Sequence, residues 1–166
     1  MTTQHLLLMR HAKSSWNHEG LTDHERPLNK RGRRASRDIG DVLRAKSLVP
    51  DHIWSSDSAR TRETFAHTFA DSGIKPKWHS GFYHASANQV LYICAENGEP
   101  ETGTLMLLGH NPGWEDLLFH FSGLSRRMPT GACAIFDRTR TKADWLERES
   151  WRLVELLLPR EYERNA

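Results

Sequence analysis

The sequence predicts an α/β fold in which a mostly parallel central sheet is covered by helices on both faces. Short apolar runs alternate along the chain with longer stretches of helical period, a pattern typical of parallel sheets. The last two apolar runs, 132–136 and 151–158, are separated only by a polar loop. They predict a C-terminal hairpin that adds antiparallel strands at one edge of the sheet.

The first half of the chain predicts three strands and two helices. In order these are strand 6–9, helix 29–46, strand 50–55, helix 58–71 and strand 74–79. The first strand is a short, continuous apolar run with polar punctuation after it, which indicates burial on both faces. Asp57 or Ser58 is suited to cap the start of the second helix, and Gly73 is suited to end it.

The second half predicts two further helices and three further strands. In order these are helix 86–97, strand 104–108, helix 112–121 and strands 132–136 and 151–158. Asn97 and Gly98 close the first of these helices, and Pro112 stands at an early position of the second, where proline is tolerated. We find no internal repeat and no linker, so the sequence predicts one domain over residues 1–166.

The composition argues against several classes of function. Lys and Arg number 23 against 21 Asp and Glu, a net charge of +2 that favours neither nucleic-acid binding nor a membrane surface. Residues 1–5 have no basic segment, and the apolar run after them is far shorter than a membrane span. We therefore expect a cytoplasmic protein. Cys94 and Cys133 have no CxxC partner, which favours two reduced core thiols over a disulfide or a catalytic cysteine.

Chemically reactive side chains follow three of the predicted strands. Arg10 and His11 end the first, the segment 55–60 with Arg60 ends the second, and His110 follows the strand 104–108. The carboxyl ends of parallel strands meet at one edge of a sheet, so these side chains should lie together.

Two arginines and two histidines at one edge favour an oxyanion site over a metal site. The guanidinium group stays charged and binds phosphate through two hydrogen bonds. Free N–H groups at helix N-termini bind phosphate as well, and Arg60 and His110 each stand near a predicted helix start. A divalent metal favours histidine together with carboxylate or thiolate ligands, and a neighbouring arginine repels it. Phosphate is the preferred interpretation, and a metal the alternative.

Five ordered segments carry a resemblance to a known family. They are LLLMRHA (6–12), DHERPLNKRG (23–32), SSDSARTRET (55–64), GHNPG (109–113) and MPTGA (128–132). Together they resemble the histidine phosphatase superfamily, with its phosphoglycerate mutase-like fold. Ala12 in the usual glycine position, followed by KSSW, resembles the small SixA-like branch of phosphohistidine phosphatases. The resemblance implies a three-layer sandwich.

The resemblance also implies roles for individual residues. His11 is expected to attack phosphorus through a neutral ring nitrogen and to form a phosphohistidine intermediate. Arg10 and Arg60 are expected to clamp the phosphoryl oxygens, and His110 to add a hydrogen bond or a positive charge. Beyond these four catalytic residues, Asn17 and Arg26 are candidates for contacting phosphate or substrate. The chemistry implied needs neither a cofactor nor a metal.

One position departs from the family pattern. His84 stands where related sequences often have a glutamate that protonates the leaving group. Histidine is mostly deprotonated above its reference pKa of about 6.5, so His84 is either a weak substitute in substrate binding and protonation or a surface residue without a role. Glu19, Asp23 and Asp57 are other carboxylates near the site, and the sequence selects none of them.

The missing glutamate bears on the substrate. A sugar alkoxide needs an acid to leave, whereas the imidazole of phosphohistidine needs much less help, so protein phosphohistidine is the favoured substrate. Phosphatase action on small phosphorylated metabolites, and a phospho-ligand binding module without turnover, remain as alternatives. A mutase is disfavoured because no extra segment is available to hold its intermediate. Of the six tryptophans, five are expected in the core, while Trp16 follows the nucleophile in the same loop and is either buried or part of the site.

Overall fold

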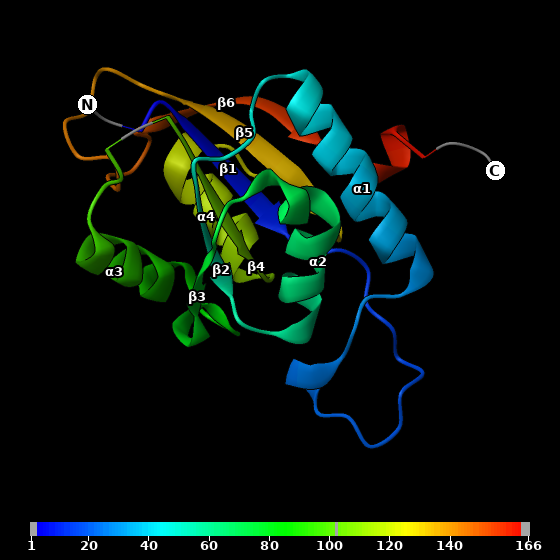
Figure 1. The fold of residues 1–166 in the computed structure, drawn as a ribbon. Helices are drawn as coiled ribbons and strands as arrows, with labels where there is room; N and C mark the ends of the chain where they lie inside the picture. Colours follow the sequence, from blue (N-terminus) through cyan, green and yellow to red (C-terminus); the bar gives the residue numbers. More distant parts are fainter. Residues whose placement is uncertain (1–2, 102, 164–166) are drawn as a thin grey trace.

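A computed structural model describes residues 3–101 and 103–163 of the chain. Its centre is one six-stranded sheet with the order β3-β2-β4-β1-β5-β6 (Figure 1). The strands are β1 (His5–Arg10), β2 (His52–Ser56), β3 (Lys77–His79), β4 (Thr104–Gly109), β5 (Cys133–Arg138) and β6 (Trp151–Leu157). The first four are parallel to one another, and β5 and β6 form an antiparallel hairpin beside β1. The predicted sheet and its edge hairpin are confirmed.

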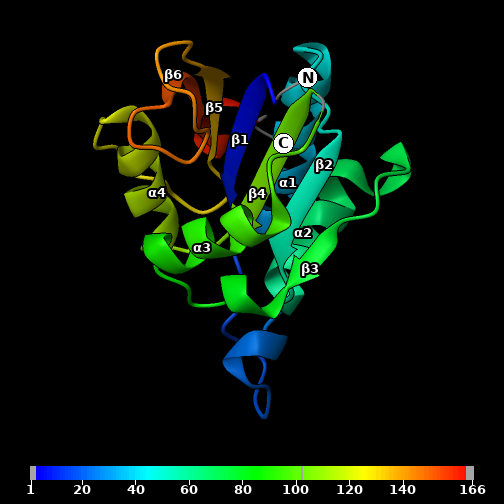
Figure 2. The same ribbon diagram turned by 90° about the vertical axis from the view of Figure 1, so that its left-hand side faces the viewer.

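Four helices cover the two faces of this sheet, as Figure 2 shows. Helices α1 (Lys30–Ala45) and α2 (Ala59–Phe69) lie on one face, and α3 (Ala87–Asn97) and α4 (Gly113–Ser122) lie on the other. Short 3₁₀ turns follow or precede them: η1 (Asp23–Glu25), η2 (Ala70–Ser72), η3 (Ser80–Phe82) and η4 (Pro159–Glu161). The three-layer sandwich is therefore confirmed. No described helix is long and apolar enough to cross a membrane.

The alternation of side chains along β1 divides the core into two layers. Leu6 and Leu8 pack with Trp114 of α4 on one side, while Leu7 and Met9 pack with α1 on the other. Each of these side chains is fully buried, and burial of a leucine or methionine stabilises a fold by roughly 1.5–3 kcal/mol. The central strand is thus fixed from both faces, which makes its carboxyl end a rigid platform.

Both cysteines are free and buried, as predicted. Cys94 lies in the layer under α3 and α4, and Cys133 in the opposite layer. Burial raises the pKa of the Cys94 thiol to about 12 and that of Cys133 further still. Such thiols stay protonated and act as small apolar side chains.

Several predicted boundaries differ from the observed ones by one to three residues, and two of the differences have a clear physical reason. The strand predicted over 74–79 is only Lys77–His79, because Pro76 has no N–H group to donate to the sheet. The helix predicted over 58–71 ends at Phe69 and continues as η2, while Ser58 is its N-cap and Gly73, with φ of +81°, ends the segment in the left-handed conformation. The 3₁₀ turns carry no apolar period, and the sequence predicts none of them.

Strands β1, β2 and β4 have their carboxyl ends side by side at one edge of the sheet. Arg10 pairs with Gly109 in the sheet register, and the His11 N–H donates to the Gly109 carbonyl over 2.9 Å. The chain from 11 to 29 then extends beyond this end of the sheet (Figure 2). Gly32 lets this loop pack directly on α1, because a Cβ there would stand 2.1 Å from the carbonyl oxygen of Lys13. The predicted common edge is confirmed.

Candidate active site

A cavity of about 340 Å³ opens at the carboxyl ends of the parallel strands. Its lining residues are Arg10, His11, Lys13, Ser14, Trp16, Asp23, Arg26, Arg60, His84, His110, Asn111 and Thr130. Six of the seven side chains proposed from the sequence are among them. The seventh, Asn17, is exposed on the loop and does not line the cavity.

His11 lies at the base of the cavity with one ring nitrogen fixed. Its Nδ1 is 2.7 Å from the carbonyl oxygen of Ala12. A carbonyl only accepts, so Nδ1 carries the proton and Nε2 keeps its lone pair. Burial, together with the charges of Arg60, Arg10 and Arg26, lowers the pKa of His11 to about 3 against the opposing effect of that hydrogen bond. The imidazole is therefore neutral at neutral pH, as a nucleophile must be.

His110 faces His11 with 5.1 Å between the ring centroids. Burial lowers the pKa of His110 to about 2, helped by His11 and Arg60. Its Nε2 is 2.8 Å from the Ser56 hydroxyl oxygen, which already accepts from the Ser58 N–H. When the Ser56 hydroxyl donates to Nε2, Nδ1–H is the free donor. Of the two roles expected, the geometry fits a hydrogen-bond donor rather than a positive charge.

Two guanidinium groups, one half-buried (Arg10) and one buried (Arg60), complete the polar wall. Arg10 donates from Nη1 to the Met128 carbonyl over 3.0 Å. Arg60, with only 4% of its area exposed, donates to the backbone and carboxylate oxygens of Asp23 over 2.7 and 3.0 Å. The Nε atoms of both arginines and Nδ1 of His110 are buried without a hydrogen-bond partner. Buried donors without partners are rare, and an oxyanion supplies the acceptors that they lack.

Of the three carboxylates left open by the sequence, Asp23 is the one that lines the cavity. Burial pushes its pKa upward, but hydrogen bonds from Tyr83, His84 and Arg60 outweigh this and hold the pKa well below its usual range. Arg26 adds an ion pair of 3.1 Å. Asp23 is therefore ionised, and it is the only carboxylate among the described residues that line the cavity.

The two other carboxylates left open by the sequence lie outside the cavity. Asp57 is bound to the Nε2 of His24 over 2.9 Å, and Glu19 is exposed on the loop. The choice of Asp23 depends on how the loop folds back onto Arg60. Sequence spacing carries no signal for that contact.

His84 lines the cavity at its mouth. Its side chain is 60% exposed, and its ring stacks on His110 with 6.0 Å between centroids. The backbone of His84 has φ of +53°, the left-handed region that residues other than glycine seldom adopt. This turn directs the ring toward Asp23, whose Oδ2 lies 3.1 Å from its Nε2.

Sequence reasoning missed several side chains that build the site. The Tyr83 hydroxyl donates to the Asp23 carboxylate. Glu115 accepts from the Asn111 side chain over 2.9 Å and from the Met128 N–H over 2.8 Å, which positions the carbonyl that holds Arg10. Two of these residues could have been found from their position next to predicted site residues, since Tyr83 directly precedes His84 and Asn111 directly follows His110.

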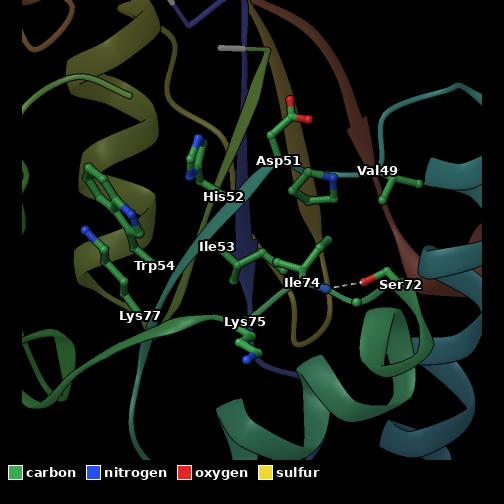
Figure 3. Close-up of a pocket in the computed structure, with 11 residues that line it drawn as sticks. Val49, Asp51, His52, Ile53, Trp54, Ser72, Ile74, Lys75 and Lys77 are labelled. Carbon is green, nitrogen blue, oxygen red and sulfur yellow. Dashed lines mark hydrogen bonds between the residues drawn. The ribbon is translucent and has the colours of Figure 1, made fainter. Parts of the chain in front are cut away.

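A larger groove of about 620 Å³ lies at the other end of the sheet (Figure 3). It is lined by the start of β2 and by residues 72–75 and 77. None of the predicted site residues lies there. In the described parts of the chain, no three His, Cys, Asp or Glu side chains are grouped to hold a metal ion. The absence of a metal requirement stays a prediction.

Comparison with known proteins agrees with this geometry. Residues 6–88 match the model of the histidine phosphatase superfamily (branch 1). An uncharacterized chloroplastic protein of Arabidopsis thaliana is 34% identical over 143 residues, which cover 80% of this chain and 66% of that protein. An uncharacterized protein of Mycobacterium tuberculosis is 32% identical over 152 residues, covering 85% of this chain and 92% of its own. The chain belongs to the histidine phosphatase superfamily.

Solved structures place it in the SixA-like branch of that family. A SixA protein from Agrobacterium tumefaciens, described provisionally as a phosphohistidine phosphatase, is 30% identical with a TM-score of 0.80, covering 96% of this chain and 100% of that one. A protein histidine phosphatase SixA complexed with tungstate shares the fold at 15% identity, with a TM-score of 0.78 and 96% and 99% coverage. Family and site together support a phosphatase activity.

Proposed function

We propose that this protein hydrolyses phosphohistidine on a protein substrate, through a covalent phosphohistidine intermediate at His11. The observation that carries the chemistry is a neutral, buried His11 whose Nε2 lone pair is fixed by the Nδ1–H bond to Ala12. The family membership supports phosphoryl transfer in general. The choice of phosphohistidine depends on Asp23.

In the first step, Nε2 of His11 attacks phosphorus and the bond from phosphorus to the substrate nitrogen breaks. The electron pair of that bond leaves with the imidazole, and the phosphoryl group becomes bonded to His11. Arg10, Arg60 and His110 line the cavity and supply its hydrogen-bond donors to the phosphoryl oxygens. Donors already fixed in place stabilise the transition state without reorganisation, which is the main device of phosphoryl-transfer catalysis.

The leaving group decides among substrates. Asp23 is ionised, so it has no proton to give an alkoxide. A phosphohistidine ring that is protonated on its second nitrogen leaves as neutral imidazole and needs no such acid. An anionic carboxylate near the cavity mouth stabilises that cationic ring and repels negatively charged leaving groups. This favours a phosphoramidate over a phosphorylated sugar acid.

In the second step, water attacks phosphorus on His11 and releases inorganic phosphate. The electron pair of the bond returns to Nε2, which restores the neutral imidazole. Ala12 holds the Nδ1–H throughout, so the leaving nitrogen is the one that first attacked. The cycle regenerates the enzyme with no change in its net protonation.

The test is turnover of a phosphohistidine peptide, an aryl phosphate and 3-phosphoglycerate with EDTA present. We expect the peptide to be hydrolysed fastest, activity to survive EDTA, and His11→Ala to abolish it. Preference for 3-phosphoglycerate would move the function to small metabolites. Tight binding of all three without turnover would make the protein a phospho-ligand binding module, and loss of activity in EDTA would support a metal route.

A further inference from the structure

Trp16 is the most exposed of the large apolar side chains that the structure describes. Its exposed fraction is 79%, whereas Trp54, Trp114, Trp145 and Trp151 are each 5% exposed or less. An indole ring carries one of the largest apolar surfaces of any side chain, so leaving it in water forfeits substantial stability. Trp16 also lines the catalytic cavity, which sets it apart from the other exposed aromatic side chains, Tyr92 and Phe119.

One face of the indole ring is held in place by Arg26. The guanidinium carbon of Arg26 lies 3.6 Å from the ring centroid. Arg26 is only 12% exposed and is fixed in turn by the Ser14 hydroxyl and by the Asp23 carboxylate. With one face covered by a fixed group and 79% of the side chain still exposed, the ring offers an open face in a defined orientation.

The same contacts tie Trp16 to the phosphate-binding residues. Arg26 bonds Asp23 through Oδ1, and Asp23 bonds Arg60 through Oδ2. The indole ring is thus joined to the Asp23 carboxylate through the Arg26 guanidinium. Asp23 and Trp16 line the same cavity, so a group that leaves from phosphorus can contact both.

We propose that Trp16 determines specificity by stacking its open face on a planar, cationic leaving group. This rests on the proposed function and assigns a residue to its specificity: Trp16 favours a phosphoramidate whose nitrogen belongs to an aromatic ring. A protonated imidazole fits both contacts, because it is attracted to an indole face and to a carboxylate. An acyclic phosphoramidate has the same phosphorus–nitrogen bond but no ring to stack.

The experiment compares phosphoimidazole with phosphoramidate, using the full-length wild type, Trp16→Ala and Trp16→Phe. We expect Trp16→Ala to lower kcat/KM for phosphoimidazole about tenfold, mainly through KM, because the stacking contact with the ring is lost. Phosphoramidate should change less than twofold, and Trp16→Phe should recover most of the loss. Tyr92→Ala, an exposed aromatic outside the cavity, is the matched control and should alter neither substrate.

Equal losses for the two substrates, or no loss for either, would overturn the stacking role. Calorimetric binding of both compounds to His11→Asn protein, with and without Trp16→Ala, separates this proposal from the proposed function. If phosphoimidazole binds in a way that depends on Trp16 but the wild type does not hydrolyse it, the stacking role is supported and the phosphatase activity is refuted. If the wild type hydrolyses phosphoimidazole and Trp16→Ala does not change its preference over phosphoramidate, the phosphatase activity is supported and the stacking role is refuted.

Discussion

The proposed catalytic cavity and the groove in Figure 3 lie at opposite ends of the sheet, and the smaller of the two holds the predicted site residues. The groove measures about 620 Å³ and the cavity about 340 Å³. The cations of the groove, Lys75 and Lys77, are exposed, while in the cavity Arg60 is almost fully buried. The state of the charged groups, rather than the volume, distinguishes the two regions.

The physical difference is one of unmet hydrogen bonding. In the groove the Asp51 carboxylate accepts from the Thr104 N–H over 2.8 Å, and the lysines are solvated. In the cavity, Nε of both Arg10 and Arg60 is buried without a partner. Buried donors without a hydrogen-bond partner are costly, and this cost favours an anionic ligand at the cavity wall.

The largest effect we expect from the polar wall is at Arg60. Arg60→Ala removes a buried donor to the transferring phosphoryl group and should lower kcat/KM about 10²–10³-fold, measured by steady-state kinetics with a phosphohistidine peptide. Arg60→Lys should recover only part of this, because a single ammonium cannot replace the fork of the guanidinium. A change below threefold for Arg60→Ala would break the contrast between the two regions.

The buried histidines predict how stability depends on pH. The pKa of His110 is about 2 in the folded protein, against about 6.5 for an unfolded histidine. Stability is therefore fully present above pH 6.5, and below it the unfolded chain takes up a proton that the folded one does not. Each such histidine lowers the free energy of unfolding by about 1.4 kcal/mol per pH unit below 6.5.

Denaturant unfolding at several values between pH 7 and pH 5 checks this slope. His110→Asn should remove the contribution of one histidine to the slope of unfolding free energy against pH, while the contribution of His11 remains. His67 and His79, whose pKa values burial also lowers, contribute a further part that this substitution leaves in place. A wild type whose stability is flat over this range would show that the cavity histidines titrate normally.

A smaller effect is expected at the cavity mouth. Asp23→Asn should lower kcat/KM for the phosphohistidine peptide about tenfold and change that for an aryl phosphate much less, because a phenolate leaves as an anion. Asp57→Asn is the matched control, since Asp57 pairs with His24 outside the cavity. Equal losses for both substrates would mean that Asp23 only positions Arg60.

The smallest effect should be in the groove. Lys75→Ala and Lys77→Ala remove exposed charges far from the carboxyl ends of the strands, so kcat/KM should stay within twofold of the wild type in the assays described for Arg60. Surface charges of this kind usually contribute little to stability as well. A tenfold loss of activity would show that the groove takes part in substrate binding.

The sequence predicted those parts of the molecule that depend on local pattern. The continuous apolar run of β1 and the alternation with helices were enough to place Arg10, His11, Arg60 and His110 at one edge. Asp23 was not distinguishable from Glu19, because its position depends on the loop after His11 folding back onto Arg60.

Other features depend on contacts that leave no periodic signal. The left-handed backbone of His84 and the stacking of Arg26 on Trp16 arise from tertiary packing. Asn17, three residues beyond the buried Ser14, is exposed. Sequence motifs therefore identified the residues at the base of the cavity better than those at its mouth.

The most direct test of the central claim is to trap the intermediate. The wild type, mixed rapidly with a ³²P-labelled phosphohistidine peptide and quenched in base, should carry a phosphate that is stable in alkali, labile in acid and located on His11 by peptide mapping. His11→Asn should carry none. A labelled residue other than His11, or full turnover with no labelled protein at any time, would contradict the account.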